Sequence, residues 1–322
     1  MKQSRRDFVR TLFVATQAAV AGRFLPGTLE ASIVAEPPAR PGGLNFLVFG
    51  DWGRNGETDQ ANVAVQMAIA AKLVGAKFVI SVGDNFYEDG VASTDDKQWQ
   101  TSFEKVYNAP SLQVPWPVIL GNHDYHGNCD AQIAYSQISR RWQMPARYFV
   151  RSEKIDAATT ADFFYLDTTP MIKKYYDVGE KTRANVHMQD VPKQMAWFKD
   201  ALAKSTAQWK FVIGHHPIYS GGEHGDTPEL IESVLPLLHE YNVQAYFNGH
   251  DHDLQHLEAG AVNFFDSGAG SRFRATAKSK YTKFAEGCSG FTAVTLEADQ
   301  MRVRMIDIHG TLLYTATVPR VS

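Results

Sequence analysis

Cysteine is scarce in this chain of 322 residues, which contains only Cys129 and Cys288. Two cysteines exclude a disulfide framework and a thiolate metal cage. They can pair once or stay free, and no sequence feature decides between these alternatives. Basic residues do not dominate either, because 32 Lys and Arg stand against 35 Asp and Glu, for a formal net charge of −3. We therefore expect neither nucleic acid nor anionic membranes as bulk partners.

The apolar stretch near the amino terminus, Thr11 to Gly22, is too short to span a bilayer. It follows a basic head, Ser4-Arg5-Arg6-Asp7-Phe8-Val9-Arg10. Paired arginines in this context resemble a twin-arginine export signal, which carries folded proteins across a bacterial inner membrane. An ordinary amphipathic N-terminal helix is the alternative. We expect residues 1–35 to be a cleaved export signal and residues 36–42 a linker, leaving a periplasmic or secreted protein without stable membrane insertion.

From Leu44 onward, short apolar runs alternate with stretches of helical periodicity. Strands are expected at 44–50, 77–82, 118–120, 163–166, 210–213 and 243–247, and helices at 58–74, 99–107, 191–203 and 230–241. Runs at 261–265, 291–296, 301–308 and 311–318 are typical of antiparallel strands, with a hairpin turn at His309-Gly310. This order predicts one α/β domain over residues 43–322, built on a mixed sheet or on two sheets packed face to face with helices outside.

Five polar clusters stand where expected strands end, and each opens with glycine. They are Gly50-Asp51-Trp52-Gly53, Gly83-Asp84-Asn85-Phe86-Tyr87, Gly121-Asn122-His123-Asp124, Gly214-His215-His216-Pro217 and Gly249-His250-Asp251-His252. A single Asp or His after a strand is usually a turn or cap residue. Five clusters together indicate a ligand site, because ligands of α/β sheets bind outside the carboxyl ends of the strands.

Oxygen and nitrogen donors without sulfur suit iron, zinc or manganese. His250 and His252 are two residues apart, so an extended backbone would place both imidazoles on one face with Cα atoms roughly 6–7 Å apart. That spacing matches one imidazole for each of two ions held about 3.5–4 Å apart, with a carboxylate such as Asp84 bridging them. The clusters therefore predict a two-metal centre.

In their order, these five motifs resemble the calcineurin-like metallophosphoesterases. Tyr87, three residues after Asp84, narrows the resemblance to the purple acid phosphatases. The stretch from Asp84 to about Trp142, with Ala131-Gln-Ile-Ala-Tyr-Ser136, is similar to the small tartrate-resistant type. The likeness covers nearly all of residues 43–318. It implies the αββα metallophosphoesterase fold, in which two mixed β-sheets are packed as a sandwich flanked by helices, with the metals at the sheet edge.

Carried over residue by residue, the resemblance implies an iron(III) site and a second, divalent site of iron, zinc or manganese. Iron(III) would bind Asp51, Tyr87 and His252, the second ion would bind Asn122, His215 and His250, and Asp84 would bridge both. His123 and His224 match the family's outer histidines. His216 departs from the small members, which often have tyrosine there, so substrate preference and pH optimum do not transfer.

These roles agree with physical chemistry. A free phenol has a pKa near 10, so Tyr87 needs a highly charged ion beside it to bind as phenolate, and phenolate-to-iron charge transfer would colour the protein. Such an ion also lowers the pKa of bound water, which permits hydroxide attack at acidic pH. His123 can donate to phosphoryl oxygens, and His224 can protonate the leaving alkoxide. We therefore expect an acid phosphatase that acts on small phosphate monoesters. The sequence leaves the oligomeric state open, with a monomer favoured.

Two alternatives remain open. A phosphodiesterase or nucleotidase would use the same dimetal site, although such relatives typically lack a phenolate ligand. A non-catalytic metal- or phosphate-binding protein on the same scaffold would need the ligands but not the proton donors His123 and His224. A serine or cysteine hydrolase has no support, because the sequence contains no Gly-x-Ser-x-Gly elbow and no Cys–His pairing.

Overall fold

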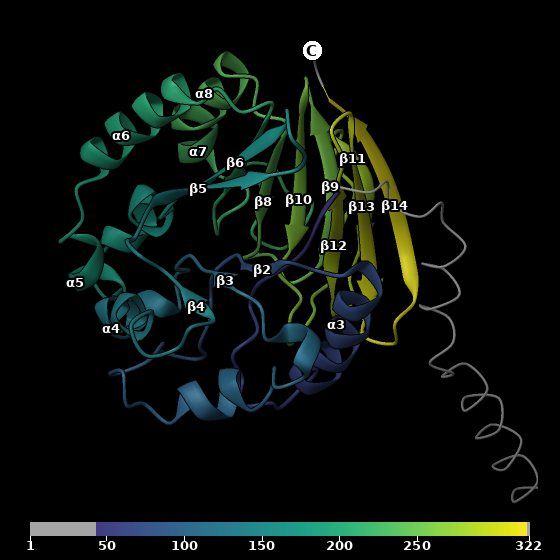
Figure 1. Ribbon diagram of the computed structural model, residues 1–322. Helices are drawn as coiled ribbons and strands as arrows, with labels where there is room; N and C mark the ends of the chain where they lie inside the picture. Colours follow the sequence, from purple (N-terminus) through teal and green to yellow (C-terminus); the bar gives the residue numbers. More distant parts are fainter. Residues whose placement is uncertain (1–42, 321–322) are drawn as a thin grey trace, which may run out of the picture.

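Two β-sheets form the centre of the molecule, in a computed structural model that describes residues 43–320 (Figure 1). The smaller sheet has the strand order β14-β13-β12-β1-β2. Its strands are β1 (Leu44–Phe49), β2 (Phe78–Ser81), β12 (Gly290–Leu296), β13 (Gln300–Asp307) and β14 (Leu312–Pro319). β1 pairs with β2 in parallel and with β12 antiparallel, so this sheet is mixed.

The larger sheet has the order β11-β9-β10-β8-β7-β6-β5. Its strands are β5 (Phe149–Lys154), β6 (Thr160–Tyr165), β7 (Trp209–Ile213), β8 (Ala245–Asn248), β9 (Leu254–Ala259), β10 (Val262–Ser267) and β11 (Thr282–Glu286). Strands β6, β7, β8 and β10 are parallel neighbours, whereas β5, β9 and β11 run antiparallel to theirs. Two short strands, β3 (Trp116–Pro117) and β4 (Trp142–Gln143), pair beside the sandwich.

Side-chain alternation along β1 holds the two sheets together. Phe46 points into the space between the sheets, where its ring lies 5.4 Å from that of Phe163 and 6.3 Å from that of Phe247. Leu47 and Phe49 belong instead to the cluster that packs against the helices. Because successive side chains of a strand point to opposite faces, this central strand is apolar on both sides.

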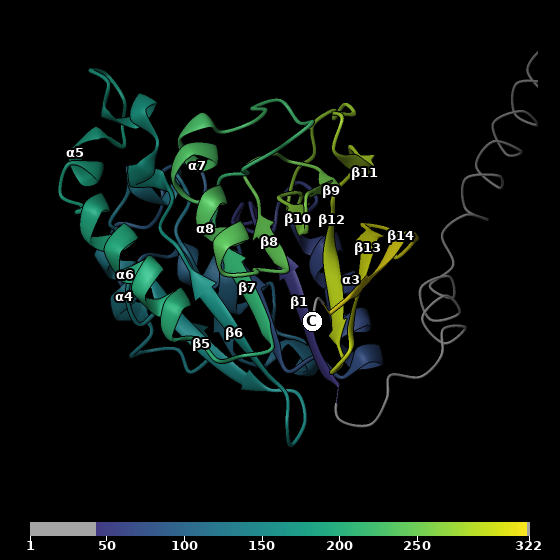
Figure 2. The same ribbon diagram turned by 90° about the horizontal axis from the view of Figure 1, so that it is seen from above.

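Helices cover the outer face of each sheet (Figure 2). They are α3 (Gln60–Val74), α4 (Cys129–Tyr135), α5 (Arg183–Val186), α6 (Val191–Lys204), α7 (Pro228–Ser233) and α8 (Leu235–Glu240), with short 3₁₀ or π turns at 99–104, 110–112, 124–126, 169–171 and 173–176. The helix α3 covers β1 and β12, while α6 packs on β6, where the rings of Phe198 and Phe164 lie 6.2 Å apart. The predicted sandwich flanked by helices is confirmed.

Some element boundaries differ from those expected. The strand predicted at 118–120 is a single bridge at Val118 beyond the short β3. The helix predicted at 230–241 is two helices, α7 and α8, because Pro236 in the first turn of α8 cannot donate a hydrogen bond to the preceding turn. The strands β5, β9 and β11 were not predicted. The hairpin at His309-Gly310 joins β13 to β14, and Gly310 there has a φ of 78°.

The export signal and linker expected over residues 1–42 lie outside the described residues. Within residues 43–320, no helix combines the length and apolarity that crossing a bilayer requires. Cys129 and Cys288 are both free thiols.

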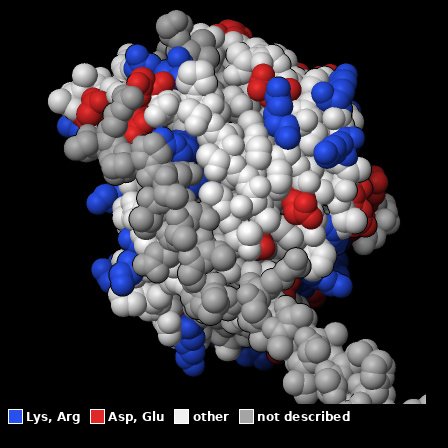
Figure 3. All heavy atoms as spheres, turned by 90° about the vertical axis from the view of Figure 1, so that its right-hand side faces the viewer, with Lys and Arg blue, Asp and Glu red and all other residues white. Residues whose placement is uncertain are grey.

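Figure 3 shows the face of the molecule on the side of β14, where acidic and basic side chains are interspersed around a broad uncharged area. The strand β14 itself has no charged residue.

Candidate metal centre

The parallel strands end at a common edge, and all five glycine-led clusters lie there. The clusters follow β1, β2, the Val118 bridge, β7 and β8. Asp51, Asp84, Tyr87, His215, His250 and His252 are all buried, at 6% exposure or less, while Asn122 and His123 are partly exposed. Polar side chains from five separate segments, most of them buried, thus meet at one edge of the sandwich.

The hydroxyl of Tyr87 is the centre of one group. Its oxygen lies 2.9 Å from Oδ1 of Asp51, 3.0 Å from Oδ2 of Asp84 and 3.2 Å from Nε2 of His252. Nε2 of His252 also lies 3.4 Å from Oδ1 of Asp51. Four side chains from three loops therefore converge within hydrogen-bond distance, and their donor atoms are mainly oxygens.

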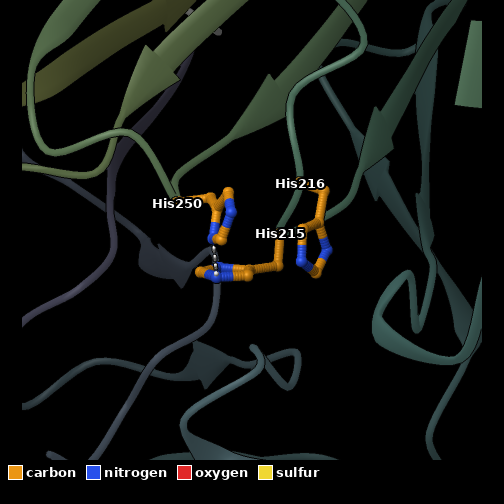
Figure 4. A group of neighbouring side chains, drawn as sticks. All are labelled: His215, His216 and His250. Carbon is orange, nitrogen blue, oxygen red and sulfur yellow. Dashed lines mark hydrogen bonds between the residues drawn. The ribbon is translucent and has the colours of Figure 1, made fainter. Parts of the chain in front are cut away.

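The imidazole of His215 is the centre of a second group. Its Nε2 lies 3.2 Å from Oδ1 of Asn122, 3.3 Å from Nδ1 of His250 and 3.5 Å from Oδ2 of Asp84. Nδ1 of His215 lies 2.9 Å from the carbonyl oxygen of Val82, so the opposite nitrogen of the ring faces the group. Figure 4 shows His250 meeting His215 in this way.

The carboxylate of Asp84 belongs to both groups. Its Oδ2 faces Tyr87 and His215, and its Oδ1 accepts a hydrogen bond of 2.8 Å from the backbone N–H of His123. The two groups are therefore adjacent and share one side chain, as a bridging role requires.

The backbone at this edge is strained and closely packed. Asp51, Asp84 and His250 have φ values of 60°, 48° and 73°, in a region that residues with a side chain seldom occupy. A Cβ atom at Gly121 would lie 2.2 Å from Oδ1 of Asp84, and one at Gly249 would lie 2.3 Å from Oδ2 of Asp51. These two glycines leave the space that the carboxylates fill.

The expected geometry of His250 and His252 was wrong in one respect. Residues 250–253 form a bend after β8 rather than an extended strand, and His250 has a left-handed backbone conformation. The imidazoles still approach the site, His250 beside His215 and His252 beside Tyr87. The bend, and not a shared strand face, sends one imidazole to each group.

The negative charges of the site favour cations. Burial and the carboxylates of Asp51 and Asp84 raise the pKa of the Tyr87 phenol well above its ordinary value, so the phenolate would need a cation beside it. Burial opposes ionisation of Asp84, but His215 and the N–H of His123 hold the pKa of this carboxyl well below its usual range. Burial and neighbouring imidazoles lower the pKa of His250, so it stays neutral, as a metal ligand must be.

His252 has one buried ring nitrogen without a partner. Its Nδ1 forms no hydrogen bond among the described residues, while its Nε2 faces the Tyr87 hydroxyl and Oδ1 of Asp51. Buried polar atoms are rarely unpaired. Two groups have donor atoms within 4.8 Å of one another, namely Asp51, Asp84 and His215, and His215, His216 and His250. Oxygen and nitrogen donors of this kind fit iron, zinc or manganese.

His123 and His224 flank the two groups, and each has one ring nitrogen fixed. Nδ1 of His123 lies 2.6 Å from the carbonyl oxygen of Glu88, and its ring centroid lies 4.4 Å from that of Tyr87. Nδ1 of His224 lies 2.8 Å from Oδ1 of Asp251, and its ring centroid lies 4.0 Å from that of His250. Both imidazoles are thus held against the candidate ligands.

His216 is held by two hydrogen bonds outside the central groups. Its Nδ1 lies 2.9 Å from Oγ1 of Thr168, and its Nε2 lies 2.9 Å from the hydroxyl of Tyr175. Its ring packs 4.4 Å from that of His250, beside which it stands in Figure 4. Both nitrogens are occupied, so His216 supports a candidate ligand rather than serving as one.

Two supporting carboxylates were missed in the sequence, although each stands inside a recognised motif. Asp251 is buried and binds His224 through both Nδ1 and the backbone N–H, at 2.8 and 2.9 Å. Asp124 accepts hydrogen bonds from the N–H groups of Gly121 and Asn85, at 2.8 and 3.1 Å. Burial raises the pKa of Asp124 to about 7, and the charge of Asp84 acts in the same direction. Their positions in Gly-His-Asp-His and Gly-Asn-His-Asp were the available signal.

Comparisons with known proteins agree with this geometry. The profile of the calcineurin-like phosphoesterase family matches residues 44–254. The chain is 38% identical to purple acid phosphatase 17 of Arabidopsis thaliana over 299 residues, which are 87% of this chain and 85% of that protein. It is 37% identical to tartrate-resistant acid phosphatase type 5 of Sus scrofa over 297 residues, which are 86% of this chain and 87% of that protein.

A solved structure gives a second kind of likeness. The fold matches GAP50, described as the anchor in the inner membrane complex of Plasmodium, with a TM-score of 0.78 and 25% identity. The match covers 87% of this chain and 90% of that chain. Proteins named as enzymes and a protein named as an anchor are thus both similar to this chain.

Proposed function

Because this chain belongs to the calcineurin-like phosphoesterases, and within them to the purple acid phosphatases, we propose that it hydrolyses small phosphate monoesters at an iron(III)–divalent metal pair. The observation that supports this most is the position of the Tyr87 hydroxyl, within 3.2 Å of Asp51, Asp84 and His252. A phenol among carboxylates and an imidazole has little structural purpose, whereas a phenolate is a strong ligand for iron(III).

In this proposal, Asp51, Tyr87 and His252 would hold iron(III), and Asn122, His215 and His250 would hold iron, zinc or manganese as the second ion. Asp84 would be shared between the two ions. When bound, such a pair supplies a Lewis acid that activates water at acidic pH and offsets negative charge on the phosphoryl group.

The protein's own groups perform the remaining work. His123, whose Nδ1–H donates to the Glu88 carbonyl, would donate to a phosphoryl oxygen through Nε2 when the imidazole carries both protons. His224 protonates the leaving alkoxide, and the Asp251 carboxylate orients its ring by binding Nδ1. A buried carboxylate behind an imidazole fixes its tautomer and stabilises the imidazolium form that donates the proton.

The proposal is tested by two measurements on the purified protein. An absorption band in the green-to-yellow region is expected from Tyr87 bound to iron(III). Hydrolysis of a phosphate monoester is expected to exceed that of a matched diester, since a phosphodiesterase on the same site would reverse this order. A colourless, active, zinc-only protein would contradict the iron assignment.

The likeness to GAP50 favours one second candidate, a non-catalytic binding protein on this scaffold. His123→Ala distinguishes the two. For an enzyme, the metal content of the variant should match that of the wild type, while turnover falls by about 10²-fold or more, as for loss of a catalytic proton or charge contact. Unchanged turnover would remove His123 from the mechanism, and absence of turnover in the wild type would favour the binding protein.

Export to the periplasm or the medium is a separate part of the proposal, based on Arg5 and Arg6. Replacing both with lysine keeps the charge of the segment but removes the paired arginines that a twin-arginine system recognises. The variant is expected to accumulate inside the cell, measured by fractionation with antibody detection. Normal export of the variant would contradict a twin-arginine route.

A further inference from the structure

A cation lies on the ring of Tyr87. Cζ of Arg54 is 3.8 Å from the centroid of that ring, and the Arg54 side chain is only 13% exposed. Guanidinium groups within about 6 Å of an aromatic centroid are attracted to the ring's electrons. This contact is therefore close and largely shielded from water.

The position of Arg54 is fixed from several directions. Its Nη1 forms an ion pair with the carboxylate of Glu88, and its backbone N–H donates to Oε1 of Gln60 at 3.0 Å. Nε of Arg54 is buried without a hydrogen-bond partner among the described residues. An arginine that served only solubility would keep its donors in water, whereas this one forgoes a hydrogen bond while it stacks on Tyr87.

The loops that carry Arg54 and Tyr87 are locked together at Gly53. The backbone N–H of Tyr87 donates to the carbonyl of Gly53 at 2.9 Å. A Cβ atom at Gly53 would lie 1.9 Å from the carbonyl oxygen of Asn85. Only glycine permits this approach, which places the residue after it beside the Tyr87 ring.

We propose that Arg54 is a positioning residue that sets how strongly Tyr87 donates electrons to the iron. The inference rests on the proposed assignment of Tyr87 to iron(III), and goes beyond it by assigning a role to a residue that is not a ligand. The guanidinium acts through the ring, and Glu88 acts by holding the guanidinium in place.

The direction of the effect follows from Coulomb's law. The charge-transfer band moves an electron from the phenolate ring to the metal. Arg54 lies over the ring of Tyr87, which donates the electron, whereas the iron that accepts it would bind the hydroxyl oxygen. A positive charge that is nearer to the donor than to the acceptor makes removal of the electron more costly. Arg54 therefore shifts the band to shorter wavelength, and removing the charge should shift it to longer wavelength. The same removal should lower the reduction potential of the iron, because a nearby cation favours the added electron.

The test compares absorption spectra and reduction potentials of the iron-loaded protein and its variants. Arg54→Gln keeps a planar side chain but removes the charge, so the band should move to longer wavelength and the potential should fall. Arg54→Lys keeps the charge, so its band should lie closer to that of the wild type. Glu88→Gln releases Arg54 and should shift the band in the same direction as Arg54→Gln, but less.

Arg274→Gln is the matched control. Arg274 donates from its backbone to the carbonyl of His252 at 2.8 Å, and its Nη1 pairs with Glu223 at 3.0 Å. The substitution removes the same charge from a residue whose backbone contacts another candidate ligand but whose guanidinium does not stack on Tyr87, so the band should stay in place.

The outcomes separate this inference from the proposed function. A wild-type protein that binds iron without a visible band overturns the assignment of Tyr87, and the role of Arg54 with it. A wild-type band that both Arg54→Gln and Glu88→Gln leave unmoved overturns the role of Arg54 alone. A shift as large in Arg274→Gln or Arg54→Lys as in Arg54→Gln also overturns it, because stacking of a charge would then not be the cause.

Discussion

Buried histidines lie in two regions of this molecule, and their ring nitrogens have different partners. His256, in the middle of β9, has Nδ1 3.0 Å from the hydroxyl of Tyr314 and Nε2 2.9 Å from Oδ1 of Asn263. At the strand ends, Nε2 of His215 faces Nδ1 of His250 at 3.3 Å, and Nε2 of His252 lies 3.2 Å from the Tyr87 hydroxyl and 3.4 Å from Oδ1 of Asp51. Burial alone therefore does not mark a functional histidine. A nitrogen that faces another imidazole or a carboxylate cluster does.

The largest expected effect follows from removing the side chain that both groups share. Asp84→Asn leaves a neutral amide where two cations need a bridging charge, so both ions should bind poorly and turnover should fall by about 10³-fold or more. Metal analysis and a monoesterase assay measure the two losses. Asp89→Asn is the control, because Asp89 is an exposed neighbour that pairs with Lys181. Retention of both metals in Asp84→Asn would show that the groups are independent.

Tyr87→Phe removes a donor from one group only. The visible band should disappear, and iron affinity should fall by at least the ~10–100-fold that loss of a metal site's outer hydrogen-bond partner already causes. The second ion should be retained better than iron, because His215, Asn122 and His250 keep their contacts. Competition with a chelator, followed by analysis of each metal, measures this difference. Equal loss of both ions would contradict the division into two groups.

Asp251→Asn tests the histidine that is fixed by a carboxylate rather than by a metal. The amide can no longer stabilise the charged His224 imidazole, so turnover of an alkyl phosphate should fall by roughly 10²-fold. An aryl phosphate with an acidic leaving group needs less protonation and should be affected much less. The ratio of the two rates is the measurement, and equal losses would indicate that Asp251 acts on folding instead.

The smallest effect is expected at His256 in β9, away from the strand ends that carry the candidate metal centre. Burial lowers the pKa of His256 below its ordinary value near 6.5, so the histidine binds a proton less readily in the folded protein than in the unfolded chain. The contribution to stability is complete above about pH 6.5 and declines as the pH falls toward the lower folded pKa. His256→Gln should be destabilised by about 1 kcal/mol at pH 7.5, from weakened hydrogen bonds, and by less at pH 5.

Urea unfolding at the two pH values measures that change. His239→Gln, at an exposed position on α8, is the control and should follow the wild type at both pH values. A variant of His256 whose deficit grows on acidification would contradict the predicted sign.

Much of the fold and the site was predictable because the information is local. A strand end followed by a polar turn is indicated by short local motifs such as Gly50-Asp51, Gly121-Asn122 and Gly249-His250. The family resemblance indicates which ligand each motif supplies. The helix break at Pro236 could also have been predicted from proline chemistry. Weak strands such as β5 and β11 could not, since they depend on pairing with β6 and β9 and on contacts with distant residues, such as the stacking of Phe284 on Tyr314.

What was missed depends on contacts between distant segments. The left-handed turn at His250 sends that imidazole toward His215, but the residue type does not predict it, because most histidines have a negative φ. The hold of Asp251 on His224 joins residues 27 positions apart, and the stacking of Arg54 on Tyr87 joins residues 33 positions apart. Such pairings follow from how loops approach one another in space, which spacing in the chain does not reveal.

The contact at Gly53 limits how this centre can be transplanted or varied. The backbones that carry Asp51 and Tyr87 pass so close together that neither loop keeps its shape without the other. An engineer who grafts the tyrosine segment onto a foreign scaffold must bring the aspartate segment as well. Natural variants should likewise change these two segments together. Although a helix and a strand separate them in the chain, the two segments are expected to evolve as one unit.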